Sequence, residues 1–145
     1  MNPYDPVLRD KLLKRIGDIN DPATPCPLVT LEEFFEGNND PGSIGYNILE
    51  PPTPSEFFEL FTLIRNRPDV STVLVEVMDV DEEFGGWPAS ETIWVITTSD
   101  ASEVRKWIPQ KFFPDEVLEG FESLGPKKEH FEIPQGMRAV GIWWD

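Results

Sequence analysis

The chain is poor in the residues on which many catalytic and metal sites depend. Its 145 residues include one cysteine, Cys26, and one histidine, His130, so zinc sites of the usual cysteine and histidine kind are excluded within one chain. No apolar run approaches the about 18 residues that a membrane-spanning helix needs, and the first residues do not resemble a secretory signal. Glycine-rich phosphate-binding motifs and the nucleophile elbow are also absent. We therefore expect a cytoplasmic protein without membrane contact, cofactor or catalytic residue.

Basic residues are scarce as well. Twelve lysines and arginines stand against 27 aspartates and glutamates, which gives a formal net charge of −15. Residues 16–103 carry eighteen of the acids and only Arg65 and Arg67 as bases. Such a charge repels nucleic acid phosphates and attracts basic partners. We expect a basic protein partner and no direct contact with nucleic acid, while the sequence leaves the oligomeric state open.

Length and composition are typical of one globular domain, which we place over residues 1–145. An aspartate followed by a proline at positions 5 and 6 marks a helix start, because proline suits the first helical position. Prolines then interrupt the chain until Thr30 and Glu33, which together form a capping-box pattern. The sequence thus predicts an N-terminal amphipathic helix over 6–17, a proline-rich connector over 18–29 and an α+β core over 30–145.

Within this core, apolar residues at helical spacing alternate with segments rich in β-branched residues. The pattern predicts helices over 31–36, over 55–66 and after Asp100, strands over 72–80, 92–98 and 138–144, and one helical turn within 114–121. The order α-α-α-β-β-α-β indicates an α+β fold. We expect a small, mostly antiparallel sheet of three or more strands with helices packed on one face.

An acidic loop between the first two predicted strands is the main candidate site. It places three consecutive acids beside aromatic residues, and aromatic anchors ringed by charge are typical of protein interfaces. The candidate contact residues are Asp81, Glu82, Glu83, Phe84 and Trp87. A solvated hairpin loop, whose charges prevent pairing of strand edges, is the plainer interpretation.

A second polar loop, within FFEGNNDPGSIGYN, offers Asn38, Asn39 and Asp40 as additional contacts. Asparagine, aspartate, glycine and proline also favour turns for backbone reasons, and turn chemistry alone is the favoured explanation of this composition. The sequence does not decide whether residues 38–54 form a binding site or only a packed connection.

The carboxylates of the acidic segment also permit a metal site. Glu76, Asp79 and Asp81 would supply the oxygen ligands that Mg²⁺ or Ca²⁺ prefers, and a metal-assisted enzyme is the corresponding function. Strand alternation argues against this set, because Glu76 faces the opposite side of the strand from Asp79 and Asp81 unless a bulge intervenes.

Several segments resemble a group of small, acidic, uncharacterised bacterial single-domain proteins. The phrases FFEGNNDPGSIGYN, VLVEVMDVDE, WPASETIWVITTS and GIWWD carry this resemblance, which runs from about Thr30 to the C-terminus. In size, charge and strand-helix content the chain is also similar to immunity proteins of bacterial toxin systems. The resemblance implies a binding protein and lends no catalytic residues. Our leading hypothesis is an immunity protein that neutralises a basic toxin, and a DNA mimic is a further alternative.

Overall fold

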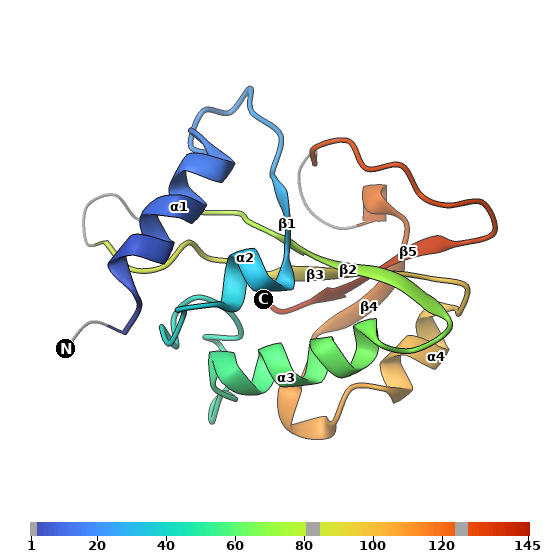
Figure 1. Cartoon of the computed structure of the whole chain (residues 1–145). Helices are drawn as coiled ribbons and strands as arrows, with labels where there is room; N and C mark the ends of the chain where they lie inside the picture. Colours follow the sequence, from blue (N-terminus) through green and yellow to red (C-terminus); the bar gives the residue numbers. More distant parts are fainter. Residues whose placement is uncertain (1–2, 81–84, 124–127) are drawn as a thin grey trace.

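The computed structural model describes residues 3–80, 85–123 and 128–145, arranged as one sheet with helices packed against it (Figure 1). The helices are α1 (Pro6–Ile16), α2 (Leu31–Phe35), α3 (Pro54–Arg65) and α4 (Ala101–Lys106), with the 3-10 helices η1 (Gln110–Phe112) and η2 (Phe121–Ser123). The strands are β1 (Leu28–Thr30), β2 (Val70–Glu76), β3 (Thr92–Thr97), β4 (Glu116–Glu119) and β5 (Arg138–Trp143). None of the helices in the described ranges is long and apolar enough to cross a membrane.

The described strands form one antiparallel sheet in the order β1-β2-β3-β5-β4. The three central strands are the segments that the sequence predicted from their β-branched residues, and the two edge strands are shorter. The predicted α+β fold with a mostly antiparallel sheet is therefore confirmed. The predicted helices and strands appear in roughly the expected order, with β1 added and with β4 in place of the helical turn predicted within 114–121.

The sheet has two faces of different character. On one face, Val73 and Val75 join the main hydrophobic core, to which all four helices contribute buried side chains. On the other face, Leu74 and Trp94 form a smaller cluster beneath the segment 121–137. This alternation is the one expected for a strand, because successive side chains point to opposite faces. The α-helices thus cover one face, as predicted, and side chains from the described residues 121–123 and 128–137 pack on the other.

Side-chain caps set the helix starts. Asp5 accepts hydrogen bonds from the backbone N–H groups of Val7 and Leu8 at 2.9 and 3.3 Å, ahead of Pro6 at the first helical position. Thr30 and Glu33 form the predicted capping box at the start of α2. Because each cap satisfies backbone donors that lack an intrahelical partner, these boundaries follow from local sequence.

Two predictions about irregular segments are wrong. The connector over 18–29 does not remain irregular to its end, because Leu28 begins β1 and pairs with Glu76. The segment 114–121 contains β4, whose residues pair with β5, instead of a helical turn. Both strands lie at sheet edges, where backbone hydrogen bonding to a neighbouring strand overrides weak local propensity.

Candidate functional site

The loop between α2 and α3 is held in place by hydrogen bonds among its own polar groups. Asn38 is buried, and its side-chain amide donates to the carbonyl of Phe34 at 3.3 Å and to Ser43 Oγ at 3.0 Å. Asn38 Oδ1 accepts the N–H of Asp40 at 2.9 Å, and Ser43 Oγ donates to the Asp40 carbonyl at 2.8 Å. The loop is therefore an ordered scaffold, and Asn38 serves it from the inside.

Asp40 joins this loop to the segment after the acidic residues. Its carboxylate accepts hydrogen bonds from the N–H of Gly42 at 2.9 Å and from the N–H of Trp87 at 3.0 Å. The two candidate segments that the sequence identified separately thus meet in space. Between them lies a cleft of about 380 Å³, which we call the acidic cleft. Its lining residues are Asp40, Gly42, Tyr46, Met78, Asp79, Gly85, Gly86, Trp87, Ala89 and Glu91.

The structure places the predicted contact residues at different depths. Asp40 is half-buried at the cleft, and Asn39 is exposed next to it. Trp87 is only 4% exposed and belongs to the main core, with its ring centroid 6.3 Å from that of Tyr4. It lines the cleft without being the exposed aromatic anchor that we expected, and Asn38 is buried in the same way. The other expected contacts, Asp81, Glu82, Glu83 and Phe84, lie outside the described residues.

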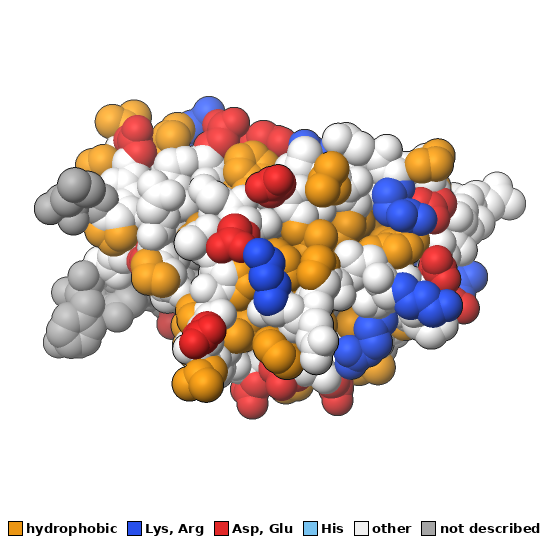
Figure 2. Space-filling model, turned by 90° about the horizontal axis from the view of Figure 1, so that it is seen from below, with side chains coloured by type: hydrophobic (Ala, Val, Ile, Leu, Met, Phe, Trp, Pro, Cys, Tyr) orange, Lys and Arg blue, Asp and Glu red, His pale blue; other side chains and the backbone are white. Residues whose placement is uncertain are grey.

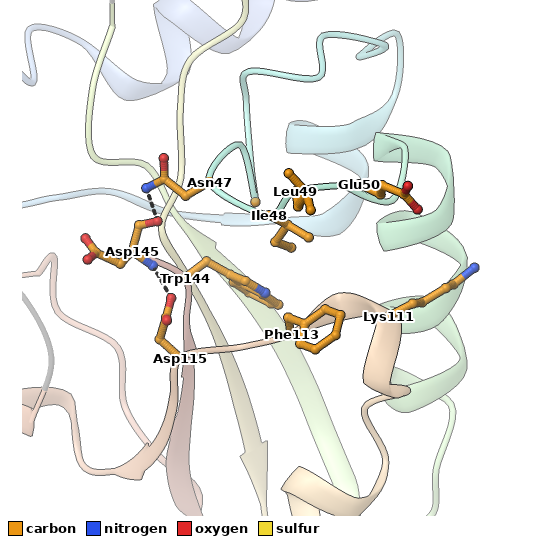
Figure 3. Close-up of a pocket in the computed structure, with 10 residues that line it drawn as sticks. Asn47, Ile48, Leu49, Glu50, Lys111, Phe113, Asp115, Trp144 and Asp145 are labelled. Carbon is orange, nitrogen blue, oxygen red and sulfur yellow. Dashed lines mark hydrogen bonds between the residues drawn. The ribbon is translucent and has the colours of Figure 1, made fainter.

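A larger pocket, of about 820 Å³, opens on the other side of the same loop (Figure 3). We call it the aromatic pocket. It brings together residues from the loop, from the segment after η1 and from the end of β5. Its lining residues are Gly45, Asn47, Ile48, Leu49, Glu50, Lys111, Phe113, Asp115, Trp144 and Asp145.

Trp144 is an immobile part of the pocket wall. The side chain is 2% exposed, and its indole Nε1 donates to the carbonyl of Phe112 at 2.7 Å. Its ring meets Phe57 and Phe61 edge to face, with centroid distances of 5.4 and 6.2 Å. Such aromatic pairs stabilise beyond their buried area, so the indole ring is held from behind by the core.

Phe113 differs from Trp144, because its ring is exposed and its backbone is strained. It is 59% exposed and has φ 40° and ψ 56°, in the left-handed region that favours glycine. A non-glycine residue there costs about 1–2 kcal/mol. Its neighbour Phe112 is buried and packs on Phe57. Figure 3 shows the Phe113 ring next to the Trp144 indole at the pocket, where backbone strain and an exposed ring coincide.

The charges around the aromatic pocket are mostly negative. Glu50, Asp115 and Asp145 are the acids, and Lys111 is the base among the lining residues. Lys111 forms an ion pair with Glu56 of α3, which holds the pKa of the Glu56 carboxyl below its ordinary value. The N–H of Asp145 donates to Asp115 Oδ2 at 2.6 Å, which keeps these two residues together (Figure 3).

Tyr46 and Glu91 connect the cleft with the pocket. The phenol of Tyr46 donates to Glu91 Oε1 at 3.4 Å, and partial burial together with this carboxylate raises the pKa of Tyr46. The Glu91 carbonyl accepts the N–H of Trp144 at 2.8 Å. This backbone hydrogen bond joins Glu91 of the cleft to Trp144 of the pocket, so the two hollows are neighbours.

On the face of the molecule seen from below, hydrophobic side chains gather between acidic and basic ones (Figure 2).

Glu76 is held inside the second face of the sheet. It is completely buried, and its Oε1 accepts the indole N–H of Trp94 at 2.9 Å and lies 3.5 Å from Lys128 Nζ. Burial raises the pKa of Glu76, although Trp94 and Lys128 favour the ionised form. The lysine ammonium also lies 5.3 Å from the Trp94 ring centroid.

The metal set proposed from the sequence gains no support from this placement. Glu76 faces Lys128, whereas Asp79 lines the acidic cleft and Asp81 lies outside the described residues. Throughout the part of the chain that the structure describes, no group of three or more acidic, histidine or cysteine residues is placed to hold a metal ion.

Sequence reasoning found the acidic cleft in part and missed the aromatic pocket. The pocket joins Leu49, Phe113 and Trp144, which lie far apart in the chain. The adjacent phenylalanines at positions 112 and 113 were the available signal, but Phe34 and Phe35 are also adjacent and both are buried. The sequence therefore did not show that Phe113 would be exposed, or what it would meet.

Comparison with known proteins places this chain in a family. No solved structure matches it. A protein from Escherichia coli (strain K12), described as "Uncharacterized protein YfbO", is 44% identical over 147 aligned positions that cover the whole of both chains. The model of the family described as "Uncharacterized protein YfbO family" matches residues 7–142, so the match includes α1 as well as the core. With nearly its whole length matched, the chain belongs to the YfbO family.

Proposed function

We propose that this chain is an acidic binding protein that neutralises a basic protein partner, in the manner of an immunity protein against a basic toxin. The contact surface in this proposal is the acidic cleft with the exposed residues around it. The observation that carries the proposal is the concentration in this cleft of carboxylates that form no ion pair with a described residue.

Elsewhere on the surface, several acids form ion pairs with bases of the same chain. Arg65 makes two hydrogen bonds of 2.7 Å to the Glu32 carboxylate. Other pairs are Arg67 with Asp69 at 3.0 Å, Arg138 with Glu119 at 3.2 Å, and Arg15 with Glu33 at 3.3 Å and Glu129 at 3.0 Å. These four arginines are used away from the cleft, whereas Arg9 donates to the carbonyl of Gly86, which lines it.

In the cleft, the balance is different. Asp40, Asp79 and Glu91 line it, and none of the three forms an ion pair with another described residue. No lysine or arginine is among the lining residues. Charge of one sign in a concave surface raises the rate at which an oppositely charged partner associates. Tyr46, 48% exposed at the rim, adds the aromatic contact area that interfaces favour.

Affinity capture from a lysate of the native host, eluted with a salt gradient, tests this proposal. The tagged chain is compared with Asp79→Lys/Glu91→Lys in the cleft and with Glu36→Lys/Glu59→Lys, which makes the same charge change at exposed positions just after α2 and on α3. We expect one stoichiometric basic partner that remains bound at about 0.15 M salt. The cleft variant loses this partner and the control variant keeps it.

Three outcomes contradict the proposal. Equal loss in both variants means that the attraction depends on net charge alone. Capture unchanged by the cleft variant means that the partner contacts another surface. Displacement of the partner by duplex DNA, with a nucleic-acid-binding protein as the captured species, favours the DNA-mimic alternative.

A further inference from the structure

We propose that the aromatic pocket is an anchor site that receives the guanidinium group of an arginine side chain from the basic partner. This inference rests on the proposed function and assigns a second part of the same surface. Tyr46 of the cleft stands in the chain between Gly45 and Asn47 of the pocket, so the two hollows are neighbours and one partner can contact both.

The exposed ring of Phe113, 59% accessible, supplies a surface for a flat cation. The Trp144 indole is buried next to it and forms the wall of the pocket, held by its hydrogen bond to the Phe112 carbonyl and by the rings behind it. Guanidinium groups stack on aromatic faces and at the same time pair with carboxylates, which ammonium groups do less well.

The charges around the pocket favour the same ligand. Glu50, Asp115 and Asp145 line it, whereas the charge of Lys111 is compensated by Glu56 outside the lining. Asp115 and Asp145 are held together by a backbone hydrogen bond of 2.6 Å. An anionic ligand would meet these carboxylates at close range, so charge complementarity selects a cation.

The backbone conformation of Phe113 is unfavourable in free energy for any residue that has a side chain. Its left-handed conformation suits glycine, and its side chain contributes little to the core because most of it faces solvent. Strained residues persist where the surrounding structure holds them and are concentrated at binding sites. If Phe113 had a purely structural role, glycine at this position would make the folded chain more stable. Substitution of Phe113 therefore tests the inference directly.

The pocket volume, about 820 Å³, lies within the range of about 300–1,000 Å³ typical of ligand pockets. It exceeds what one side chain fills. The partner therefore contributes a short segment, with the arginine among its residues and apolar neighbours against Ile48 and the highly exposed Leu49.

The experiment is a titration of the ¹⁵N-labelled full chain with three capped tripeptides, Gly-Arg-Gly, Gly-Lys-Gly and Gly-norleucine-Gly. The indole N–H signal of Trp144, assigned with Trp144→Phe, reports on the pocket. We expect a saturable shift with the arginine peptide, a weaker response to lysine and none to norleucine. Asp115→Asn reduces the affinity, and the matched control Glu59→Gln on α3 leaves it unchanged.

Phe113→Gly separates binding from folding. We expect it to weaken the arginine peptide about two- to fivefold while the melting temperature stays the same or rises. Phe113→Leu, which keeps the strain and loses the ring, weakens binding without the gain in stability. Unchanged affinity in Phe113→Gly overturns the inference, as does an equal response to arginine and lysine, an equal response to arginine and norleucine, or no response to any peptide.

These outcomes are distinct from failure of the proposed function. Peptide binding at the pocket without a captured partner contradicts the proposed function and leaves the cation site in place. A partner that is captured through the acidic cleft, with the same affinity for Phe113→Gly as for the unaltered chain, contradicts the pocket inference alone.

Discussion

The two faces of the sheet are stabilised by different means. The face under the helices is apolar, with Val75, Val95 and Val140 in contact with rings such as Phe61. The face under segment 121–137 has a smaller apolar cluster and encloses the ion pair of Glu76 and Lys128. Because residues 128–137 belong to no helix and to none of the five strands, few of their backbone hydrogen bonds are repeated ones. The comparison shows that such a stretch can be attached to a sheet at a few polar positions.

The attachment uses two adjacent residues of the covering segment. Lys128 reaches inward to Glu76. The Glu129 carboxylate accepts the N–H of Leu28 at 2.9 Å and a hydrogen bond from Arg15 at 3.0 Å. The backbone N–H of Glu129 also donates to the Cys26 carbonyl at 2.8 Å. These contacts protect the edge of β1, which would otherwise present unpaired backbone groups.

The largest expected effect is on the face under the helices. Phe61→Ala removes a completely buried ring and leaves a cavity, so we expect a loss of about 3–5 kcal/mol in the free energy of unfolding. Phe131→Ala, at a half-buried position on the other face, should cost less than half as much. Urea unfolding of both variants measures the difference. Equal losses would show that the two faces are packed alike.

Breaking the buried ion pair has the next largest effect. Lys128→Met leaves the Glu76 carboxylate buried without its cation, and we expect a loss of about 3 kcal/mol, since removing one partner of a buried pair is costly. The double variant Glu76→Gln/Lys128→Met contains no buried charge and should recover much of this loss. A double-mutant cycle by urea unfolding measures the coupling. Simple additivity of the two single effects would contradict the pairing.

The smallest expected effect is a pH dependence from Glu76. Because its pKa in the folded chain is raised above the ordinary value of 4.5, the folded state binds the proton more tightly than the unfolded state. The contribution of Glu76 to stability is therefore largest below the ordinary pKa and declines as pH rises through the folded pKa.

The comparison with Glu76→Gln isolates this contribution, since both proteins share every other titrating group. Between pH 7 and pH 5, the stability of the unaltered chain should increase relative to that of the variant. Urea unfolding at a series of pH values measures the difference. A constant difference across this range would mean that the pKa of Glu76 in the folded chain is not raised into it, which would contradict the prediction.

Much of the fold could be predicted because its signals are local. The capping box of Thr30 with Glu33 and the β-branched residues of β2 and β3 are recognised within a few residues, and the structure confirms them. The adjacent Trp143 and Trp144 point to opposite faces, as expected for a strand, and Trp144 is the buried one. The edge strands β1 and β4 were missed because their formation depends on backbone pairing with a neighbour.

The candidate site divides in the same way. The sequence identified Asp40 and Trp87 as members of two polar or acidic loops, but their hydrogen bond at 3.0 Å is a long-range contact. It predicted an exposed role for Trp87 from neighbouring charges, whereas burial is decided by what packs around the ring. Trp94 and Lys128 around Glu76 could not be found, because only the closed sheet and its covering segment bring them together.

The sequence by itself determined the composition-level properties and the local elements. It set the charge of −15, the helix caps and the inward positions of the central strands, because these depend on residue type and short spacing. The tertiary structure decided the edge strands, the buried ion pair and the two hollows on either side of the loop after α2. Each of these joins residues from distant parts of the chain, and their contacts exist only once backbone pairing and core packing have set the distances between them.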